Sequence, residues 1–437
     1  MKDMEKKKAG KQRTVFLTLL LVLSLLGSGC GDGKTGNPSH PSQTGTTSKT
    51  GSLSYGYFYG EDGDGISVSS TERFMYSDWE PVEFDYICME PTCSHRGGTC
   101  SARTISGTGD EKKDFSFIFK DRLIILHGYS QLVDNESSES VWDHSTVYQT
   151  DVYEADPDGR GRRKVATFSG MISSPIITHA AVLVDGKLYF GGPTEVRDRT
   201  EQNPGSGAMT TRSWVSDAVY CLDLNDYTIE TFADKENWEG MAQYQVYEYD
   251  GMIYGIMSDF SKDRAVWYRI DPEAGSCDEI LRFDSNVASF MGAIGDTIYY
   301  RYDASGKTLY ARDISADAEE REIMTAAGED MTAVVFVLDG QILFMTDCRM
   351  EEKDPMTEYA VLDPGGKVLD TFRYNDYITF LDVVGDKLIF YRTYAGCDEW
   401  WADKEDLPDL TEKSEPIGPF FGTMLDSVRR TVLFIRV

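Results

Sequence analysis

Histidine and basic side chains are scarce in this sequence. Its 437 residues include 5 His, and 43 Lys and Arg stand against 73 Asp and Glu, which gives a formal net charge of −30. A chain with this excess of negative charge repels phosphate backbones and anionic lipid headgroups. Nucleic acid is therefore excluded as an expected partner, and the charge indicates an acidic, solvated surface.

Long apolar runs are missing after residue 26. No later segment approaches the roughly 20 apolar residues that a membrane-spanning helix needs. The hydrolase motifs G-x-S-x-G, H-E-x-x-H and S-x-D-x-G-x-x-W are also missing, so the sequence singles out no catalytic residue. Apolar patterning with a period of 3.6 residues is absent, which excludes helical repeats.

The first 30 residues have the organisation of an export signal. A basic head, MKDMEKKKAGKQR, precedes an apolar run from Val15 to Leu26 that is too short to span a bilayer comfortably. GSGC follows and ends at Cys30, an arrangement typical of lipoprotein processing, in which the thiol is acylated and the preceding peptide is removed. We predict a lipoprotein signal peptide over residues 1–29, lipidation of Cys30, and anchoring to the extracytoplasmic side of the cell membrane. An ordinary cleaved signal with an incidental cysteine is the alternative.

A polar linker separates this signal from the rest of the chain. Residues 31–51, GDGKTGNPSHPSQTGTTSKTG, contain almost no apolar side chains and cannot bury a core. We therefore predict that residues 30–51 are the lipidated cysteine with a flexible tether, and that the folded body spans residues 52–437.

One pattern recurs along this body. An apolar strand, a turn rich in Asp and Gly, and a second apolar strand make up copies such as AAVLVDGKLYFGG and VVFVLDGQILFMT. Turns of this kind need positive φ at one or both central residues and indicate β-hairpins. The second turn residue recurs every 44 to 46 residues, with two intervals lengthened to 65, at Asp121, Gly186, Gly251, Asp296, Gly340, Asp386 and Arg430.

This period predicts an all-β fold, a β-propeller of about seven four-stranded blades, with six or eight as alternatives. A solenoid of stacked sheets is the structural alternative. Asp156, Asp223, Asp271 and Asp363 each end a third strand, where a carboxylate can accept backbone N–H groups two residues on, so we predict turn formers and not catalysts. The seventh hairpin, residues 424–437, lacks two strands, and we expect residues 65–88 to supply them and to close the ring.

Three segments depart from the repeat. Residues 130–145 and 193–216 fill the two long intervals, and residues 395–416 occupy the corresponding place in a later unit. We expect loops that thicken one rim of the ring and contact a protein or glycan ligand, because aromatic and Arg side chains are enriched at binding surfaces. The candidate contact residues are Trp142, Arg197, Arg199, Arg212, Trp214, Trp400 and Trp401. The alternative is that the tryptophans pack the loops down.

The stretch CMEPTCSHRGGTC places three cysteines and a histidine within 13 residues, 88–100. Cys88, Cys93, His95 and Cys100 are the ligand set of a closed tetrahedral zinc site, so we predict a metal site with zinc as the candidate ion. A disulfide that leaves one thiol over, and three unlinked thiols, stay open as alternatives. Cys221, Cys277, Cys348 and Cys397 are scattered singly and read as buried thiols, with a Cys348–Cys397 disulfide as an option.

Taken together, these features resemble the lipid-anchored β-propeller proteins of clostridial gut bacteria. The resemblance rests on the lipoprotein signal, the Ser/Thr/Gly tether, the C-x4-C-x-H-x4-C stretch and the hairpins that follow it. It implies an extracytoplasmic propeller and supplies no reaction.

We therefore expect a monomeric, surface-tethered binding or scaffold module, whose membrane contact is the lipid on Cys30. A polysaccharide hydrolase or lyase on a propeller scaffold and an envelope module that senses metal or redox state are the alternatives.

Overall fold

The computed structural model of the chain describes residues 50–54, 57–59, 66–69, 73–77, 85–95, 99–105, 112–137, 141–172, 179–203, 206–232, 238–239, 243–259, 264–283, 288–302, 306–315, 317–326, 333–349, 355–392 and 398–417. Residues 1–49, with Cys30, and the predicted terminal hairpin 424–437 lie outside these ranges. Among the described residues, no helix combines the length and the apolar character needed to cross a membrane.

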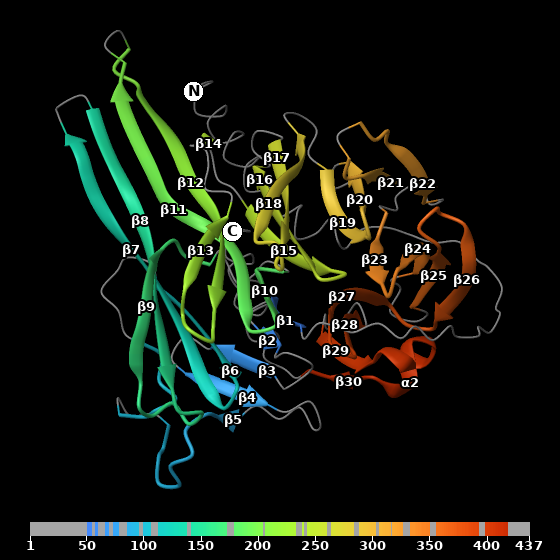
Figure 1. Ribbon diagram of the computed structural model, residues 1–437, viewed down its shortest axis with the longest axis horizontal. Helices are drawn as coiled ribbons and strands as arrows, with labels where there is room; N and C mark the ends of the chain where they lie inside the picture. Colours follow the sequence, from blue (N-terminus) through green and yellow to red (C-terminus); the bar gives the residue numbers. More distant parts are fainter. Residues whose placement is uncertain are drawn as a thin grey trace, which may run out of the picture.

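Groups of four antiparallel strands follow one another along the chain and are arranged in a ring (Figure 1). In chain order their strands are β6 (Lys112–Phe119), β7 (Arg122–Ser137), β8 (Val141–Ala155) and β9 (Arg163–Ser169); β10 (Ala181–Val184), β11 (Lys187–Gln202), β12 (Met209–Asp223) and β13 (Ile229–Phe232); β15 (Gln243–Tyr249), β16 (Met252–Asp259), β17 (Arg264–Asp271) and β18 (Ser276–Phe283); β19 (Ala288–Ile294), β20 (Thr297–Tyr302), β21 (Thr308–Asp313) and β22 (Arg321–Thr325); β23 (Val335–Leu338), β24 (Gln341–Arg349), β25 (Met356–Leu362) and β26 (Val368–Tyr374); β27 (Ile378–Val384), β28 (Lys387–Arg392), β29 (Asp398–Asp403) and β30 (Glu415–Pro416). The first two groups belong to one 14-stranded sheet with the N-terminal strands and β14 (Trp238–Glu239), and the other four groups are separate sheets. Each group of four strands is a blade, named below by its residues, for example the 112–169 blade. The all-β propeller with four-stranded blades is confirmed; the number of blades stays a prediction, because the terminal hairpin lies outside the described residues.

Neighbouring blades bury apolar side chains against each other. Trp267 of the 243–283 blade is fully buried, and its ring centroid lies 5.4 Å from that of Phe290 and 5.7 Å from that of Tyr300, both in the next blade. Val219 and Val246 meet in the same way between the 181–232 and 243–283 blades. Because each blade has a neighbour on both faces, its strands are apolar on both faces.

The hairpin turns have the backbone conformation that their sequence predicts. Both residues of Asp185-Gly186, Asp250-Gly251 and Asp339-Gly340 have positive φ, whereas in the Gly-Asp turns only the first residue, Gly295 or Gly385, does. The predicted turn formers Asp223, Asp271 and Asp363 each accept a backbone N–H two residues on, at 2.8 to 2.9 Å. For Asp156 the turn is closed by its own backbone N–H, which donates to the Arg160 carbonyl at 2.9 Å.

The N-terminal strands are β1 (Thr50–Ser54), β2 (Tyr57–Tyr59), β3 (Ile66–Ser69), β4 (Phe74–Ser77) and β5 (Asp85–Tyr86). They form an antiparallel meander, and β1 also pairs with β10, which the sequence did not predict. Within the expected closing segment, 65–88, the described strands are β3, β4 and β5. Their pairing with the hairpin at 424–437 lies outside the described residues.

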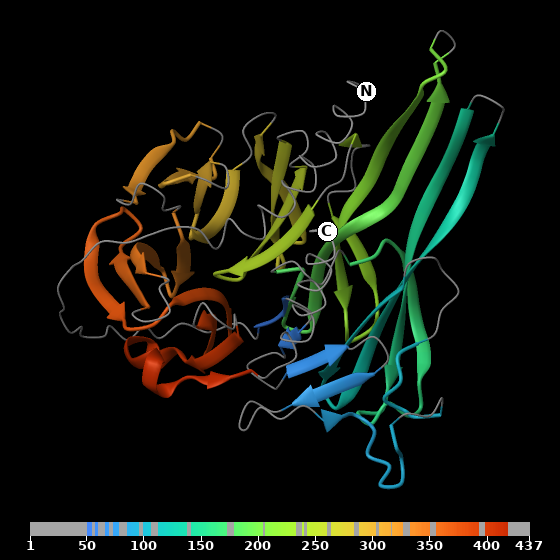
Figure 2. The ribbon, with the colours of Figure 1, turned by 180° about the vertical axis from the view of Figure 1, so that it is seen from behind.

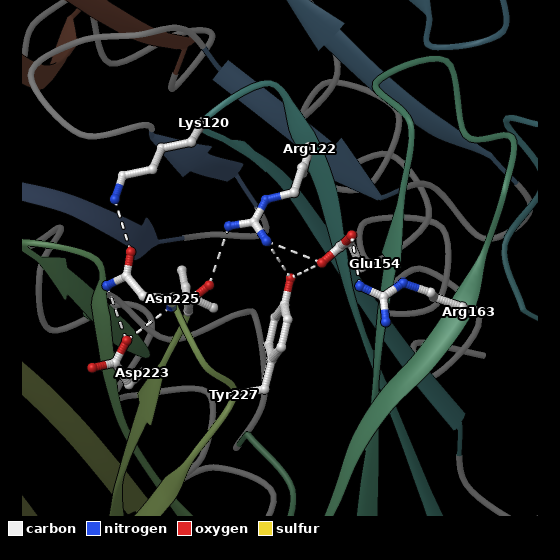
Figure 3. A network of polar contacts seen from close by, with 8 residues as sticks. Lys120, Arg122, Glu154, Arg163, Asp223, Asn225 and Tyr227 are labelled. Carbon is white, nitrogen blue, oxygen red and sulfur yellow. Dashed lines mark hydrogen bonds and ion pairs between the residues drawn. The ribbon is translucent and has the colours of Figure 1, made fainter.

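The 112–169 and 181–232 blades are joined at their turns by a polar network (Figure 3). The Arg122 guanidinium donates to the Glu154 carboxylate at 3.0 Å and to the Tyr227 hydroxyl at 2.9 Å, and the Tyr227 hydroxyl donates to the same carboxylate. Lys120 Nζ donates to Asn225 Oδ1 at 2.8 Å. Burial raises the pKa of Tyr227 to about 12, so its hydroxyl stays protonated and can remain a donor. The network therefore contributes to the packing of one blade against the other, and this accounts for its charged residues.

The segments 130–145 and 193–216 are not loops, and this prediction was wrong. They extend β7, β8, β11 and β12 beyond the blades, and β8 pairs with β11 from Val147↔Glu195 to Val141↔Glu201. The result is one projecting sheet, called the arm below, made of residues 130–137, 141–147, 193–202 and 209–216. It stands away from the ring at the upper left of Figure 1 and, seen from behind, at the upper right of Figure 2.

The third segment, 395–416, is not a rim loop either. Its residues from 398 onward form β29, a short 3-10 helix η2 (Lys404–Asp409), helix α2 (Leu410–Lys413) and β30, which complete the 378–416 blade. Trp401 is buried, and the Lys387 ammonium lies 4.8 Å from its ring centroid. The Arg392 guanidinium lies 4.7 Å from the Trp400 ring centroid. Both tryptophans therefore pack within their own blade.

Candidate functional site

The Cys/His stretch lies between the N-terminal strands and the 112–169 blade. Ile87 follows β5 directly, and its N–H donates to the Phe74 carbonyl at 3.4 Å. At the other end of the stretch, the Phe74 N–H donates to the Ala102 carbonyl at 2.7 Å. Cys88 and Cys100 are buried in the apolar cluster that these residues form with Leu123, Ile125 and Ala155 of the blade. Both ends of the stretch are thus fixed.

The four predicted ligands converge. One donor atom from each of Cys88, Cys93, His95 and Cys100 lies within 4.8 Å of all the others. Cys100 Sγ is 3.7 Å from His95 Nδ1, and the His95 N–H donates to Cys93 Sγ at 3.4 Å. His95 has a φ of 54°, a left-handed conformation that few non-glycine residues adopt. This conformation brings the imidazole back toward the cysteines.

The surroundings shift the pKa values of Cys88 and Cys100 in opposite directions. A hydrogen bond with the Ser101 side chain, followed by one with the Glu90 backbone, lowers the pKa of Cys88 to about 6. Burial is the largest influence on Cys100 and raises its pKa. Arg73 Nε donates to the His95 carbonyl at 2.5 Å, and an Arg162 guanidinium N–H donates to the Ser101 carbonyl, so two cations flank the cluster.

No disulfide joins any two of the described cysteines. They are Cys88, Cys93, Cys100, Cys221, Cys277 and Cys348. Cys397, the suggested partner of Cys348, lies outside the described residues. The thiols of the cluster are therefore available to a metal ion, since thiolates and imidazole are zinc ligands.

The arm has two unlike faces, which follow from strand register. Residues directly opposite each other on paired strands share a face, and the face alternates along each strand. On one face, called the charged face, Asp143 is opposite Arg199, and Ser145 is opposite Arg197. The predicted contact residues Arg212 and Trp214 lie opposite Arg199 and Arg197 on β12, so they belong to the same face.

Asp143 holds the charged face together. Its side chain has no exposed surface, and it accepts from Arg197 Nε and Nη2 at 2.8 and 2.6 Å. Arg199 Nη1 and Asn135 Nδ2 donate to it at 3.4 and 3.2 Å. The hydrogen bond with Arg197 is the main reason that the pKa of Asp143 falls to about 2. Arg197 and Arg199 therefore stabilise the arm internally, a function the sequence analysis did not assign to them.

The opposite face, called the Trp142 face, carries exposed apolar side chains. Trp142, Leu132 and Met209 are 62%, 56% and 59% exposed. Leu132 is opposite Thr146 on β8, and Met209 is opposite Gln202 on β11, which places all three on the same side of the sheet. Leu132 and Met209 are not among the predicted contact residues, because a segment predicted to be a loop has no fixed faces.

Trp400 and Trp401 do not join the arm residues. They lie on β29, in the blade at the other end of the described chain. Of the seven predicted contact residues, the arm thus brings together five: Trp142 on one face, and Arg197, Arg199, Arg212 and Trp214 on the other.

No family model matches this sequence, and no curated protein matches it. Among solved structures, the chain is similar to prolyl oligopeptidase B from Galerina marginata (9% identity, TM-score 0.43, 85% of this chain and 51% of that one). It is also similar to the β-propeller domain of the Trilobed protease from Pyrococcus furiosus (12% identity, TM-score 0.28, 66% of this chain and 98% of that one) and to an oligogalacturonate lyase in complex with manganese (9% identity, TM-score 0.30, 68% and 74%). The chain spans about half the length of the prolyl oligopeptidase. Similarities this distant assign no activity to it.

Proposed function

We propose that this protein is an extracytoplasmic binding protein, held to the cell membrane by lipid on Cys30, whose propeller is the rigid base for the arm. The observation that carries the proposal is the Trp142 face. Three large apolar side chains stand exposed there on three different strands, with polar residues between them. Isolated apolar anchors within a polar surround are typical of protein interfaces that form and dissociate.

The size of this face favours a protein partner over a sugar. Leu132 and Met209 lie on the outer strands β7 and β12, which are three strand spacings or about 14 Å apart. Leu132 is paired with Thr146 on β8, and Met209 is paired with Gln202 on β11. Along β11, the position opposite Thr146 and Gln202 itself are six residues, or about 20 Å, apart. A patch of this extent suits the centre of a protein interface, whereas one sugar ring covers a single aromatic side chain.

Charge narrows the class of partner. On the Trp142 face, Asp134 of β7 and Asp198 of β11 both lie directly opposite His144 of β8. Arg197 and Arg199 lie on the charged face. The chain as a whole has a net charge of −30. A protein with an apolar and basic surface therefore fits best, because opposite potentials attract and like charges at an interface are costly.

The test compares two variants of the full chain, purified in detergent and immobilised. Surface proteins of the cells that produce the chain are passed over the immobilised chain, and the retained proteins are purified. Their affinities are then measured for the unchanged chain, for the L132S/W142S/M209S variant, and for a control variant on the charged face, V133S/R212S. We expect at least a tenfold loss of affinity, about 1.4 kcal/mol, for the first variant and less than twofold for the control. Amide hydrogen exchange in the arm confirms that both variants keep the sheet.

Two results would overturn the proposal. One is a set of purified partners that bind the L132S/W142S/M209S variant as tightly as the unchanged chain. The other is retention of polysaccharides alone, lost in that variant, which would make the arm a glycan-binding surface.

A further inference from the structure

We propose that Cys88, Cys93, His95 and Cys100 bind one Zn²⁺ in a closed tetrahedral site that fastens the N-terminal strands to the 112–169 blade. The site lies between the N-terminal strands and the 112–169 blade, so the proposal does not depend on what the arm binds. It rests on the convergence of four donors on one point, on the spacing between them, and on the contacts that hold their loop against the blade.

The donors are spaced as zinc would require. Bonds of about 2.3 Å to sulfur and 2.0 Å to nitrogen at tetrahedral angles place two ligand atoms about 3.5 to 3.8 Å apart. Cys100 Sγ and His95 Nδ1 are 3.7 Å apart, and the whole set lies within 4.8 Å. Nδ1 faces Cys100, so the geometry points to Nδ1 as the imidazole ligand.

The surroundings suit a thiolate-rich ion. Zinc with three thiolates and a neutral imidazole has a net charge of −1, and binding releases the thiol protons to water. The His95 N–H donates to Cys93 Sγ at 3.4 Å, a bond that stabilises a thiolate ligand. Arg73 and Arg162, which donate to backbone carbonyls of His95 and Ser101, place positive charge beside the negative centre.

The position of the site indicates a structural task. With four protein ligands the metal has no open position, which distinguishes it from catalytic zinc. Ser101 lies against the blade, where its hydroxyl oxygen is 2.5 Å from the Asp158 carbonyl oxygen. Gly159 lies so close that a Cβ there would be 2.2 Å from the Ser101 carbonyl oxygen. Metal binding would therefore fix a loop already pressed against the turn at 156–162.

A hollow of about 400 Å³ opens beside the loop and is lined by Cys100, Arg103, Arg162 and neighbouring residues. Cys93 and His95 are themselves partly exposed, so removal of a metal by a chelator is a practical experiment.

The test uses the full chain purified without oxygen or chelator, and zinc itself as the probe. We expect about one equivalent of zinc by mass spectrometry and, after replacement by Co²⁺, the visible bands of a tetrahedral thiolate complex. The C93S/H95Q variant changes the two partly exposed ligands and should bind zinc at least tenfold more weakly in competition with a chelator. The C277S variant, changed at a partly buried thiol in another blade, is the control and should bind like the unchanged chain.

Hydrogen exchange shows whether zinc stabilises only the N-terminal strands and the Cys/His stretch or the whole fold. After chelation, residues 73–77 and 85–105 should exchange faster, while residues 335–374 should not change. The proposal is overturned if the chain holds no zinc, if its mass shows a disulfide among the three cysteines, or if C93S/H95Q binds zinc as the unchanged chain does. Equal exchange with and without zinc would contradict the claim that zinc fastens the N-terminal strands to the 112–169 blade.

Discussion

Replacing Asp143 with Asn should loosen the arm and leave the ring intact. The Asp143 carboxylate has no exposed surface and accepts two hydrogen bonds from Arg197 and one from Arg199. Hydrogen bonds to a charged group contribute about 1.5 to 3 kcal/mol each. An Asn keeps one acceptor oxygen and loses the charge, and the arginines are exposed enough to recover water. We therefore expect the arm to lose about 3 kcal/mol of stability against local opening.

The assay is amide hydrogen exchange on the D143N variant. A loss of about 3 kcal/mol should speed exchange about 100-fold in residues 131–137, 141–147 and 195–202, because 1.4 kcal/mol corresponds to a factor of ten. The E201Q variant is the matched control: Glu201 contacts the same Arg199 at 2.7 Å, but its side chain is 58% exposed, so the loss should stay below about 1 kcal/mol. Unchanged exchange in the arm of D143N, or equal acceleration in residues 335–374, would refute the reasoning.

Two further predictions concern pH and anchoring. The pKa of Asp143 is about 2 in the folded arm against an ordinary value of 3.8, so its contribution is complete above about pH 4 and disappears as the pH falls toward 2. Arm exchange, corrected for its intrinsic rate, should accelerate over this range in the unchanged chain and much less in D143N; the same slope in both would assign the effect to other carboxylates. The C30S variant should appear in the aqueous phase of a detergent partition and carry no labelled fatty acid, whereas the unchanged chain enters the detergent phase. Equal partition of the two would contradict lipidation of Cys30.

The repeat could be predicted because its information is local. Asp-Gly and Gly-Asp turns specify positive φ by their own chemistry, and Gly186, Gly251 and Gly340 adopt it. The Cys/His cluster could be predicted for the same reason: four donors within 13 residues can converge without help from distant parts of the chain.

The arm could not be predicted in this way. Both of its faces meet water over much of their area, so Leu132, Trp142 and Met209 follow no apolar alternation that a sequence pattern can detect. What makes strands of these segments is the pairing of β8 with β11, residues that are about 50 positions apart in the sequence. The pairing of β1 with β10 is long-range in the same sense.

The two adjacent tryptophans show a different difficulty. Trp400 and Trp401 lie in a stretch rich in Asp, Glu and Pro, a composition typical of exposed loops. In the structure they are successive residues of β29, so their side chains point to opposite faces of a blade, and Arg392 and Lys387 cover their rings. Only the register of β28 against β29 reveals this packing.

The outer edge of β7 has a consequence for self-association of the chain. Within the described residues, β6 pairs with β7 only as far as Tyr129, so the backbone from Gln131 onward has β8 on one side only. Such an edge is a template on which a second copy could add a strand. Its register shifts between Asp134 and Glu136, which interrupts the regular backbone edge, and Asp134 adds a negative charge beside it. The bulge and the negative charge thus protect a protruding sheet from polymerising with itself, while its broad face stays available to a different molecule.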